Sequence, residues 1–283
     1  MQAVFTRRPW QRLAVAAGMA LLGVSAQAQT TVEDLQSRGA RIGYANEKPF
    51  AYTEMDGHVT GESPQIVAAI LPALGIAKIE PVLTEWGALI PGLRAQRFDL
   101  IAAGMYITPE RCKQVLFTDP HYQLPDTLLV AQGNPKNLDS YESIAADPSV
   151  KLAITSGTVN LKYARDAGIS DDQIVQVPDT SSQLQAVLSG RADATIGTQL
   201  TMQGLEELSR GRAEALREFK DDPAHMGYGA LAFRPEDRAL RDAVNTALKQ
   251  WLGSEAHLAA VAPFGFDERN ITHKTAAELC QAE

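Results

Sequence analysis

The sequence predicts an α/β protein built of two similar lobes. Strand and helix patterns alternate between residues 40 and 103, and the same alternation restarts between residues 151 and 197. Two apolar segments, 126–132 and 226–233, are predicted to be strands that leave the first lobe and return to it. Such alternation is typical of a sheet whose faces are covered by helices, and a cleft between two such lobes commonly encloses a small ligand.

The first lobe is predicted to contain a strand, a hairpin, a helix, a strand, a short helix and a strand, over residues 40–46, 51–60, 63–74, 79–83, 86–95 and 98–103. Asp56-Gly57 has the chemistry of a hairpin turn. Ser63 is a suitable helix N-cap because Pro64 follows it at the first helical position, and Gly75 ends the helix.

The second lobe repeats this order. Its strands are predicted over residues 151–155, 173–177 and 192–197, and its helices over residues 159–167 and 181–189. A weak internal similarity supports the repeat, because "RADATIG" and "QRFDLIAAG" both follow a helix and both form a predicted strand.

The C-terminal part of the chain completes the first lobe. Leu240, Val244, Leu248 and Trp251 recur at helical spacing, and a second helical piece and a polar tail follow. Because the chain crosses between the lobes twice, we expect lobe 1 to comprise residues 29–123 and 226–283, and lobe 2 to comprise residues 124–225.

The first 28 residues have the three parts of a secretory signal peptide. A basic start with three arginines is followed by an apolar run over residues 13–24 and by Ala26-Gln27-Ala28, the small-x-small pattern that signal peptidase cleaves. The apolar run is shorter than the roughly 20 residues that a membrane anchor needs. We therefore expect export to the periplasm and cleavage after Ala28.

The composition of the remaining chain excludes several classes of partner. Removal of the signal peptide takes away three arginines and no acid, so the formal charge changes from −8 to −11. An acidic chain is a poor partner for nucleic acid or anionic lipid, which require clustered lysines and arginines. The five histidines are scattered without metal-ligand spacing, so no metal and no cofactor are expected. We expect a monomer.

The two cysteines, Cys112 and Cys280, both lie in the exported part. In an oxidising compartment they can form a disulfide that ties the C-terminus back to the first lobe. Two free, buried thiols are the alternative, and the sequence leaves both open.

Residues of distinctive chemistry follow the predicted strands, where ligands bind in open α/β sheets. In lobe 1 they are Glu47, Phe50, Trp86, Tyr106 and Arg111, and in lobe 2 they are Thr158, Asn160 and Thr198. Taken singly, an arginine is often a surface salt-bridge partner, here of Glu110 or Asp119, and aromatic residues are more often core than binding site. The common position of these eight residues at strand ends favours a ligand-binding site instead.

The chemistry of this set matches a small zwitterion. Arg111 can bind a carboxylate through two parallel hydrogen bonds, and it lies in the first helical turn after Thr108 and Pro109. Thr158 and Asn160 can add donors from the opposite lobe.

The cationic end of such a ligand has its own candidate partners. Phe50, Trp86 and Tyr106 can form aromatic walls around a flat or cationic group, and Glu47 can supply the opposing negative charge.

The segment "AGMYITPERCKQVLFTDPHY", residues 103–122, resembles the signature of bacterial extracellular substrate-binding proteins for polar amino acids, the soluble partners of ABC importers. The segments "PFAYTEMDGHVTGESPQIVAAI", "SGTVNLKYA" and "GALAFRPED" stand in the order that this resemblance expects. It implies the type II periplasmic binding protein fold, with two hinge strands and a ligand in the interlobe cleft, and delivery of that ligand to a membrane permease. Arg111 matches the family's carboxylate-binding arginine, and Thr158 matches its contact from the opposite lobe.

One departure bears on the ligand. Members that bind α-amino acids commonly carry an acidic residue in the position of Thr198, and "ATIGTQL" has none there. The chain resembles the ectoine- and hydroxyectoine-binding branch of the family, in which a glutamate, a phenylalanine, two further aromatic residues and an arginine follow one another in this order. The matching residues here are Glu47, Phe50, Trp86, Tyr106 and Arg111. Ectoine or hydroxyectoine is therefore the favoured ligand. The alternatives are a polar amino acid, a prephenate or arogenate dehydratase-type lyase that uses Glu47 as an acid, and a periplasmic sensor module.

Overall fold

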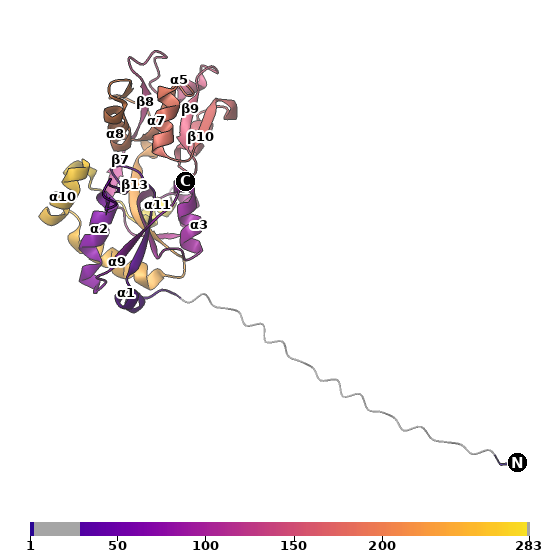
Figure 1. The fold of residues 1–283 in the computed structure, drawn as a ribbon, viewed down its shortest axis with the longest axis vertical. Helices are drawn as coiled ribbons and strands as arrows, with labels where there is room; N and C mark the ends of the chain where they lie inside the picture. The colour runs from indigo at the N-terminus through magenta and orange to yellow at the C-terminus, as the bar shows by residue number, and fades with distance from the viewer. Residues whose placement is uncertain (3–28, 282–283) are drawn as a thin grey trace.

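The protein consists of two lobes stacked end to end (Figure 1). The computed structural model describes residues 1–2 and 29–281, so the predicted signal peptide lies outside the described residues apart from its first two positions. Each lobe has its own mixed sheet, and the predicted two-lobed α/β fold is confirmed. No helix among the described residues is long and apolar enough to cross a membrane.

The sheet of lobe 1 has the strand order β4-β1-β5-β13-β6, and β7 also pairs with β13. Its strands are β1 (Ala40–Tyr44), β4 (Ile79–Leu83), β5 (Leu100–Tyr106), β6 (Leu116–Phe117), β7 (Tyr122–Leu124) and β13 (Gly227–Phe233). β1 runs parallel to both β4 and β5, whereas β13 returns antiparallel to β5. The hairpin of β2 (Tyr52–Thr53) and β3 (Val59–Thr60) stands apart from this sheet.

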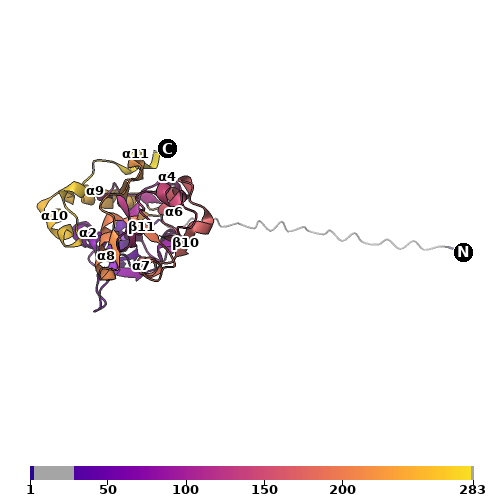
Figure 2. The ribbon, with the colours of Figure 1, turned by 90° about the horizontal axis from the view of Figure 1, so that it is seen from above.

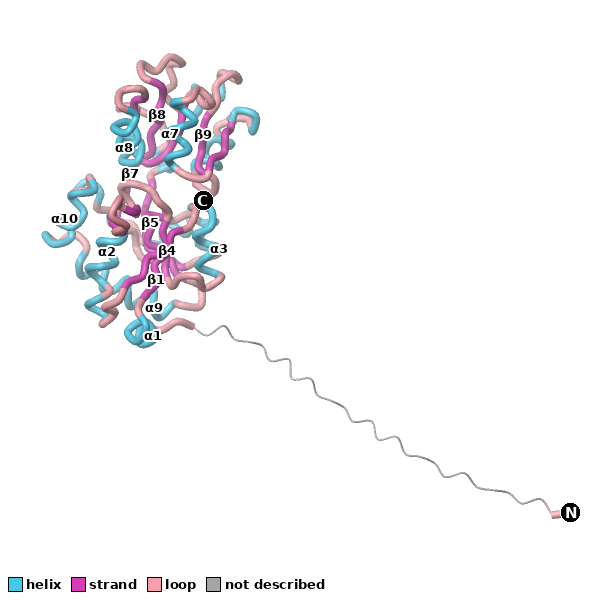
Figure 3. Tube along the Cα trace, in the orientation of Figure 1, coloured by secondary structure: helices cyan, strands magenta, loops and turns pink. Residues whose placement is uncertain are grey.

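Helices cover both faces of this sheet (Figure 3). α2, α9 and α10 bury apolar residues in one core cluster, and α3 and α11 contribute to the cluster on the other face. The helical elements of lobe 1 are α1 (Val32–Arg38), α2 (Glu62–Ile70), η1 (Pro72–Leu74), η2 (Trp86–Ala88), α3 (Leu89–Arg94), α4 (Pro109–Cys112), α9 (Arg238–Trp251), α10 (Glu255–Val261), η5 (Ala262–Phe264), η6 (Glu268–Asn270) and α11 (Ala276–Gln281).

Lobe 2 has the strand order β10-β9-β11-β8-β12. β9 runs parallel to β10 and β11, and β8 is antiparallel to β11 and β12. Its elements are β8 (Asp126–Ala131), α5 (Tyr141–Ala145), β9 (Leu152–Thr155), α6 (Asn160–Asp166), η3 (Asp171–Gln173), β10 (Ile174–Val177), α7 (Thr180–Leu188), β11 (Ala194–Thr198), α8 (Gln199–Ser209), β12 (Ala213–Ala215) and η4 (Pro223–His225).

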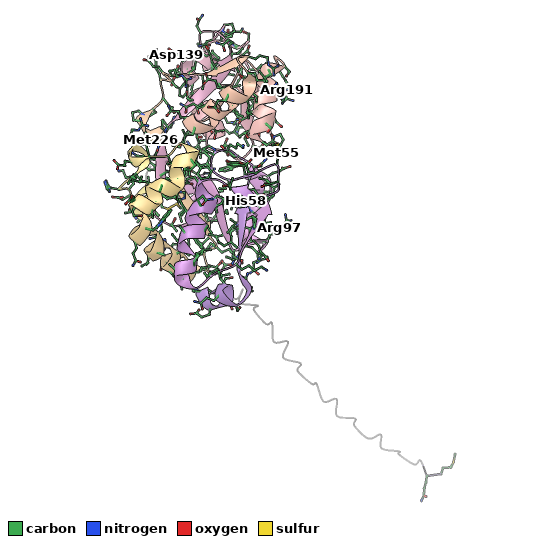
Figure 4. The ribbon with its side chains drawn as sticks, turned by 60° about the vertical axis from the view of Figure 1, so that its left-hand side comes forward. Met55, His58, Arg97, Asp139, Arg191 and Met226 are labelled. Atoms are coloured by element: carbon green, nitrogen blue, oxygen red, sulfur yellow. A yellow bond between two sulfur atoms is a disulfide. The ribbon has the colours of Figure 1, made fainter. Side chains whose placement is uncertain are left out.

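The chain passes between the lobes at two neighbouring points. One is Pro125, between β7 of the first sheet and β8 of the second, and the other is Met226, between η4 and β13. Met226 lies near the waist where the lobes meet (Figure 4). The lobe boundaries that we propose, near residues 123/124 and 225/226, fall beside these two points.

The start of α2 differs from the prediction. Gly61 is the N-cap, and Ser63 lies inside the helix. The first amide groups donate to backbone carbonyls instead of a capping side chain, Glu62 to Pro49 and Ser63 to Phe50. The hydroxyl group of Ser63 is thereby free to accept a hydrogen bond from the Gly104 amide at 3.0 Å.

A disulfide joins Cys112 of α4 to Cys280 of α11, with Cα atoms 5.7 Å apart. Figure 2 shows the two short helices close together on one side of the molecule. The bond spans 168 residues of sequence, so it fastens the C-terminal segment to the helix that carries Arg111.

Candidate ligand-binding site

A cavity lies between the two lobes, at the carboxyl ends of their parallel strands. The structure brings all eight of the predicted residues to its wall. The wall comprises Glu47, Phe50, Trp86, Ala103, Gly104, Tyr106, Arg111, Asp126, Thr155, Thr158, Val159, Asn160, Thr180, Gln183, Ile196, Gly197, Thr198 and Met202. The residues at the strand ends therefore line one cavity.

Phe50 contributes to the cavity and to the core of lobe 1 at once. Its ring lies 5.2 Å from the Tyr122 ring, centroid to centroid, and only 2% of the residue is exposed. Gly104 makes room for it, because a Cβ atom there would lie 2.4 Å from the ring, and Gly104 has φ +65°. The Phe50 wall is therefore fixed by packing before any ligand arrives.

Tyr106 is the last residue of β5 instead of following it, and it forms a second wall. Its ring lies against the returning strand at Gly227, where a Cβ atom would lie 1.9 Å from the ring. The phenol hydroxyl group donates to Asp126 Oδ1 at 3.1 Å. Only a glycine in the hinge strand allows the ring to lie this close.

Trp86 forms the half-buried lip of the cavity. It is in η2, and its indole Nε1 donates across the cleft to the carbonyl oxygen of Gly157 at 3.3 Å. The guanidinium carbon of Arg111 lies 5.8 Å from its ring centroid, within the range of a cation–π contact. The two lobes therefore meet at this lip.

Arg111 is buried in the first turn of α4, after the predicted N-cap Thr108 and Pro109. It donates from Nη1 to the Tyr106 carbonyl at 2.8 Å and from Nη2 to the Gly157 carbonyl at 3.2 Å.

The salt-bridge alternative for Arg111 is wrong. Asp119 pairs instead with Lys249 at 2.7 Å, and Glu110 is not a hydrogen-bond partner within the described residues. Burial lowers the pKa of Arg111 to about 10, so the group stays a cation at neutral pH. Both of its hydrogen bonds reach neutral carbonyls, so within residues 29–281 its positive charge faces the cavity without a carboxylate partner.

Glu47 provides a negative charge near Phe50. Its Oε1 accepts a hydrogen bond of 3.0 Å from the hydroxyl group of Thr201, which lies in the other lobe. Burial raises the pKa of Glu47 to about 7, with a smaller contribution from the nearby charge of Asp126, while the Thr201 hydrogen bond opposes the rise. A cationic ligand group would lower this pKa again.

The three predicted residues of lobe 2 already have protein partners. Thr158 donates to the Thr155 carbonyl at 2.8 Å, and Thr198 caps α8 by accepting from the Thr201 amide at 3.2 Å. The side-chain nitrogen of Asn160 donates to Asp126 Oδ2 at 2.5 Å. Lobe 2 therefore presents polar groups held in place by their own network.

Asp126 is the charged cavity residue that sequence reasoning missed. It is the first residue of β8, it is 5% exposed, and it stands directly across from Thr198 in the antiparallel pair of β8 and β11. Side chains opposite each other in such a pair lie on the same face of the sheet. Thr198 itself is not acidic, but its cross-strand neighbour places a carboxylate beside it. Only the strand register, which the sequence does not reveal, could have shown this.

These walls define a class of protein. Two lobes on paired hinge strands enclose one buried arginine, the carboxylates of Glu47 and Asp126, and three aromatic rings, an arrangement that can surround a small polar ligand from both sides. No cluster of three or more potential metal ligands occurs among the described residues. The molecule has the form of a binding protein that closes on a small solute.

The family model for bacterial extracellular solute-binding proteins, family 3, matches residues 40–258, and the chain belongs to this family. It is 34% identical over 284 residues to a probable amino-acid ABC transporter periplasmic-binding protein, y4tE, of Sinorhizobium fredii (strain NBRC 101917 / NGR234), covering 96% of this chain and 94% of the relative. The crystal structure of EhuB in complex with hydroxyectoine is similar with a TM-score of 0.84 at 34% identity, covering 89% of this chain and 98% of that one.

An enzyme also appears among the relatives. Cyclohexadienyl dehydratase of Pseudomonas aeruginosa (strain PAO1) is 28% identical over 184 residues, which is 65% of this chain and 68% of the enzyme. The matches that extend over nearly the whole chain are to binding proteins, and this protein is a binding protein and not an enzyme.

Proposed function

We propose that the protein is the extracytoplasmic solute-binding component of an ABC importer and that its ligand is a small cyclic zwitterion, with ectoine or hydroxyectoine favoured. It is exported by its signal peptide, takes up the solute in the periplasm and delivers it to permease subunits in the membrane. The observation that carries the proposal is one cavity lined by a buried arginine with no ionic partner among the described residues, a half-buried glutamate and three aromatic rings.

The ligand carboxylate lies against Arg111, which has donor groups beyond the two used on carbonyls. The delocalised cation lies near Glu47, among the rings of Phe50, Trp86 and Tyr106. Each ring–cation contact contributes on the order of 0.5–2 kcal/mol. The similarity to EhuB bound to hydroxyectoine supports this choice of ligand.

A polar amino acid is the second candidate. The name of the relative from Sinorhizobium fredii, an amino-acid ABC transporter protein, supports it. Asp126 supports it as well, because a carboxylate beside Thr198 offers a place for an α-ammonium group.

Titration calorimetry of the exported chain tests the proposal. We expect ectoine and hydroxyectoine to bind much more tightly than glutamine, histidine or glycine betaine. Tight binding of an amino acid with no heat from ectoine or hydroxyectoine would select the second candidate.

A further inference from the structure

Asp126 is a carboxylate in the cavity that the proposed carboxylate and cation contacts do not use. It lines the same wall as Tyr106, Asn160 and Thr198 and is almost completely withdrawn from solvent. A buried carboxylate retained in a cavity needs partners, because removing it from water is costly. The partners present in the structure satisfy it only in part.

Each oxygen of Asp126 accepts one hydrogen bond from a different lobe. Tyr106 of lobe 1 donates to Oδ1, and Asn160 of lobe 2 donates to Oδ2. The nitrogen of Asn160 also donates to the hydroxyl group of Tyr141 at 3.2 Å, which restrains the amide. A carboxylate can accept about four hydrogen bonds, so about two positions remain on a group whose orientation is already fixed.

We propose that Asp126 accepts a hydrogen bond from a hydroxyl group of the bound zwitterion, so that the cavity selects a hydroxylated ligand over the same ligand without the hydroxyl group. This inference rests on the proposed function, because it assigns a further contact within the same cavity. A site built to bind a ligand hydroxyl group disfavours the analogue that lacks it, since the protein group is then left short of a partner.

The two carboxylates of the cavity differ in a way that assigns the hydroxyl group to Asp126 and the cation to Glu47. Glu47 accepts one hydroxyl hydrogen bond, from Thr201, so most of its charge is uncompensated. Asp126 already accepts two, one of them from an amide nitrogen at 2.5 Å. The cation of the ligand is therefore assigned to Glu47. A neutral donor, such as a hydroxyl group, is sufficient for Asp126. Burial raises the pKa of Asp126 to about 6, which leaves the group an ionised acceptor at neutral pH.

The experiment compares hydroxyectoine with ectoine by calorimetry at pH 7.5 in four proteins: the unsubstituted chain and the variants Asp126→Asn, Glu47→Gln and Asp221→Asn. We expect the unsubstituted chain to bind hydroxyectoine about tenfold or more tightly than ectoine. Asp126→Asn should reduce this ratio to within about threefold, mainly by weakening hydroxyectoine. Glu47→Gln should weaken both ligands and keep the ratio.

Asp221→Asn is the matched control. Asp221 is a partly buried aspartate near the same hinge, it is paired with His225 at 2.5 Å, and burial raises its pKa as it does for Asp126. It is outside the cavity wall. Its substitution should leave the ratio of the two affinities unchanged.

Tyr106→Phe is a second variant in case Asp126→Asn does not fold. It keeps the ring wall and removes the hydrogen bond that orients Oδ1. We expect it to lower the preference for hydroxyectoine, to a lesser degree than Asp126→Asn.

Three results overturn the inference while leaving the proposed function intact. The first is equal affinity of the unsubstituted chain for hydroxyectoine and ectoine. The others are an affinity ratio that is unchanged in Asp126→Asn, or one that is lost to the same degree in Asp221→Asn. Absence of binding by both ligands would instead overturn the proposed function and this inference with it. The free amino acid arginine is a further test ligand. If it binds more tightly than ectoine and hydroxyectoine, and if Asp126→Asn removes most of that affinity, Asp126 is a partner for a cation and the inference is also overturned.

Discussion

The two lobes supply different chemistry to the same cavity. Lobe 1 contributes three aromatic rings, Glu47 and Arg111, whose charges have no ionic partner among the described residues. Lobe 2 contributes threonines, an asparagine and the carboxylate of Asp126, all already bonded within the protein. It reaches lobe 1 through the Gly157 carbonyl, Thr201 and Asp126. The difference indicates a division of work, in which lobe 1 provides most of the affinity and lobe 2 provides closure.

The largest effect should come from the cation of lobe 1. Arg111→Ala removes the charged partner of the ligand carboxylate, and truncating one member of a buried, hydrogen-bonded charge pair costs at least about 2 kcal/mol, or roughly 30-fold in affinity. Calorimetry of ectoine and hydroxyectoine measures the loss. Arg94→Ala, an exposed arginine of α3, is the control and should bind normally. Unchanged affinity in Arg111→Ala would remove this residue from the site.

The anion of lobe 1 should make binding depend on pH. Only the ionised form of Glu47 attracts a cation, and its pKa is about 7 in the ligand-free cavity. Affinity should therefore fall about fourfold between pH 8 and pH 6.5. Glu47→Gln should bind about 10- to 100-fold more weakly at pH 8, because it loses a charge-assisted contact, and should lose the pH dependence over this range. A parallel pH profile in the variant would contradict the assignment.

The same residue predicts how stability changes with pH. A folded-state pKa above the ordinary value means that Glu47 favours folding when protonated, and that this contribution is lost as the pH rises through 7. The ligand offsets the loss by neutralising the ionised form. Thermal unfolding should therefore show a larger ligand-induced rise in Tm at pH 8 than at pH 6.5. A smaller rise at pH 8 would contradict this account.

The contribution of lobe 2 to closure should be smaller. Gly157 has φ +84°, and a Cβ atom there would lie 3.0 Å from the Cα atom of Gly87 in lobe 1. Gly157→Ala should cost about 1 kcal/mol in stability through backbone strain and weaken ligand binding about tenfold by disfavouring the closed form.

Gly168→Ala separates these two effects. Gly168 has φ +88° with no atom within 4 Å of the added Cβ, so it should lose similar stability and bind normally. Equal affinity losses in both variants would mean that strain, and not contact between the lobes, decides the result.

The smallest effect on binding should come from the disulfide. Replacing Cys112 and Cys280 by serine should lower the free energy of unfolding by about 2–5 kcal/mol, since the bond closes a long loop. The affinity should change less than about twofold, because neither cysteine lines the cavity. Chemical denaturation and calorimetry on the same samples measure both quantities. A large loss of affinity would show that α11 positions Arg111 through α4.

Sequence reasoning located the fold and the cavity wall because both follow from local patterns. Strand and helix periodicity gave the two α/β units, and the carboxyl ends of the strands gave the wall residues. Thr108 and Pro109 predicted the start of α4 correctly because capping is a local interaction. The N-cap Ser63 was wrong because distant carbonyls at Pro49 and Phe50 satisfy the amides of α2.

The remaining features depend on pairings between distant parts of the chain. Asp126 joins the site through its register opposite Thr198, which lies 72 residues further along the chain. The Gly157 carbonyl receives two donors from lobe 1, and the identity of a residue does not show what its backbone carbonyl binds. The helices α1, α5 and α8, of 7, 5 and 11 residues, were not predicted.

The hydrogen bond from Trp86 to Gly157 gives the protein an optical signal of its own. This indole spans the cleft, so opening of the lobes exchanges a carbonyl partner for water and changes its fluorescence. Within residues 29–281 the one other indole is Trp251, at the end of α9, where it packs edge-on against His257 away from the cavity. With Trp251→Phe as the background, each turn of the cycle between the empty and loaded states can be followed in real time without an attached dye.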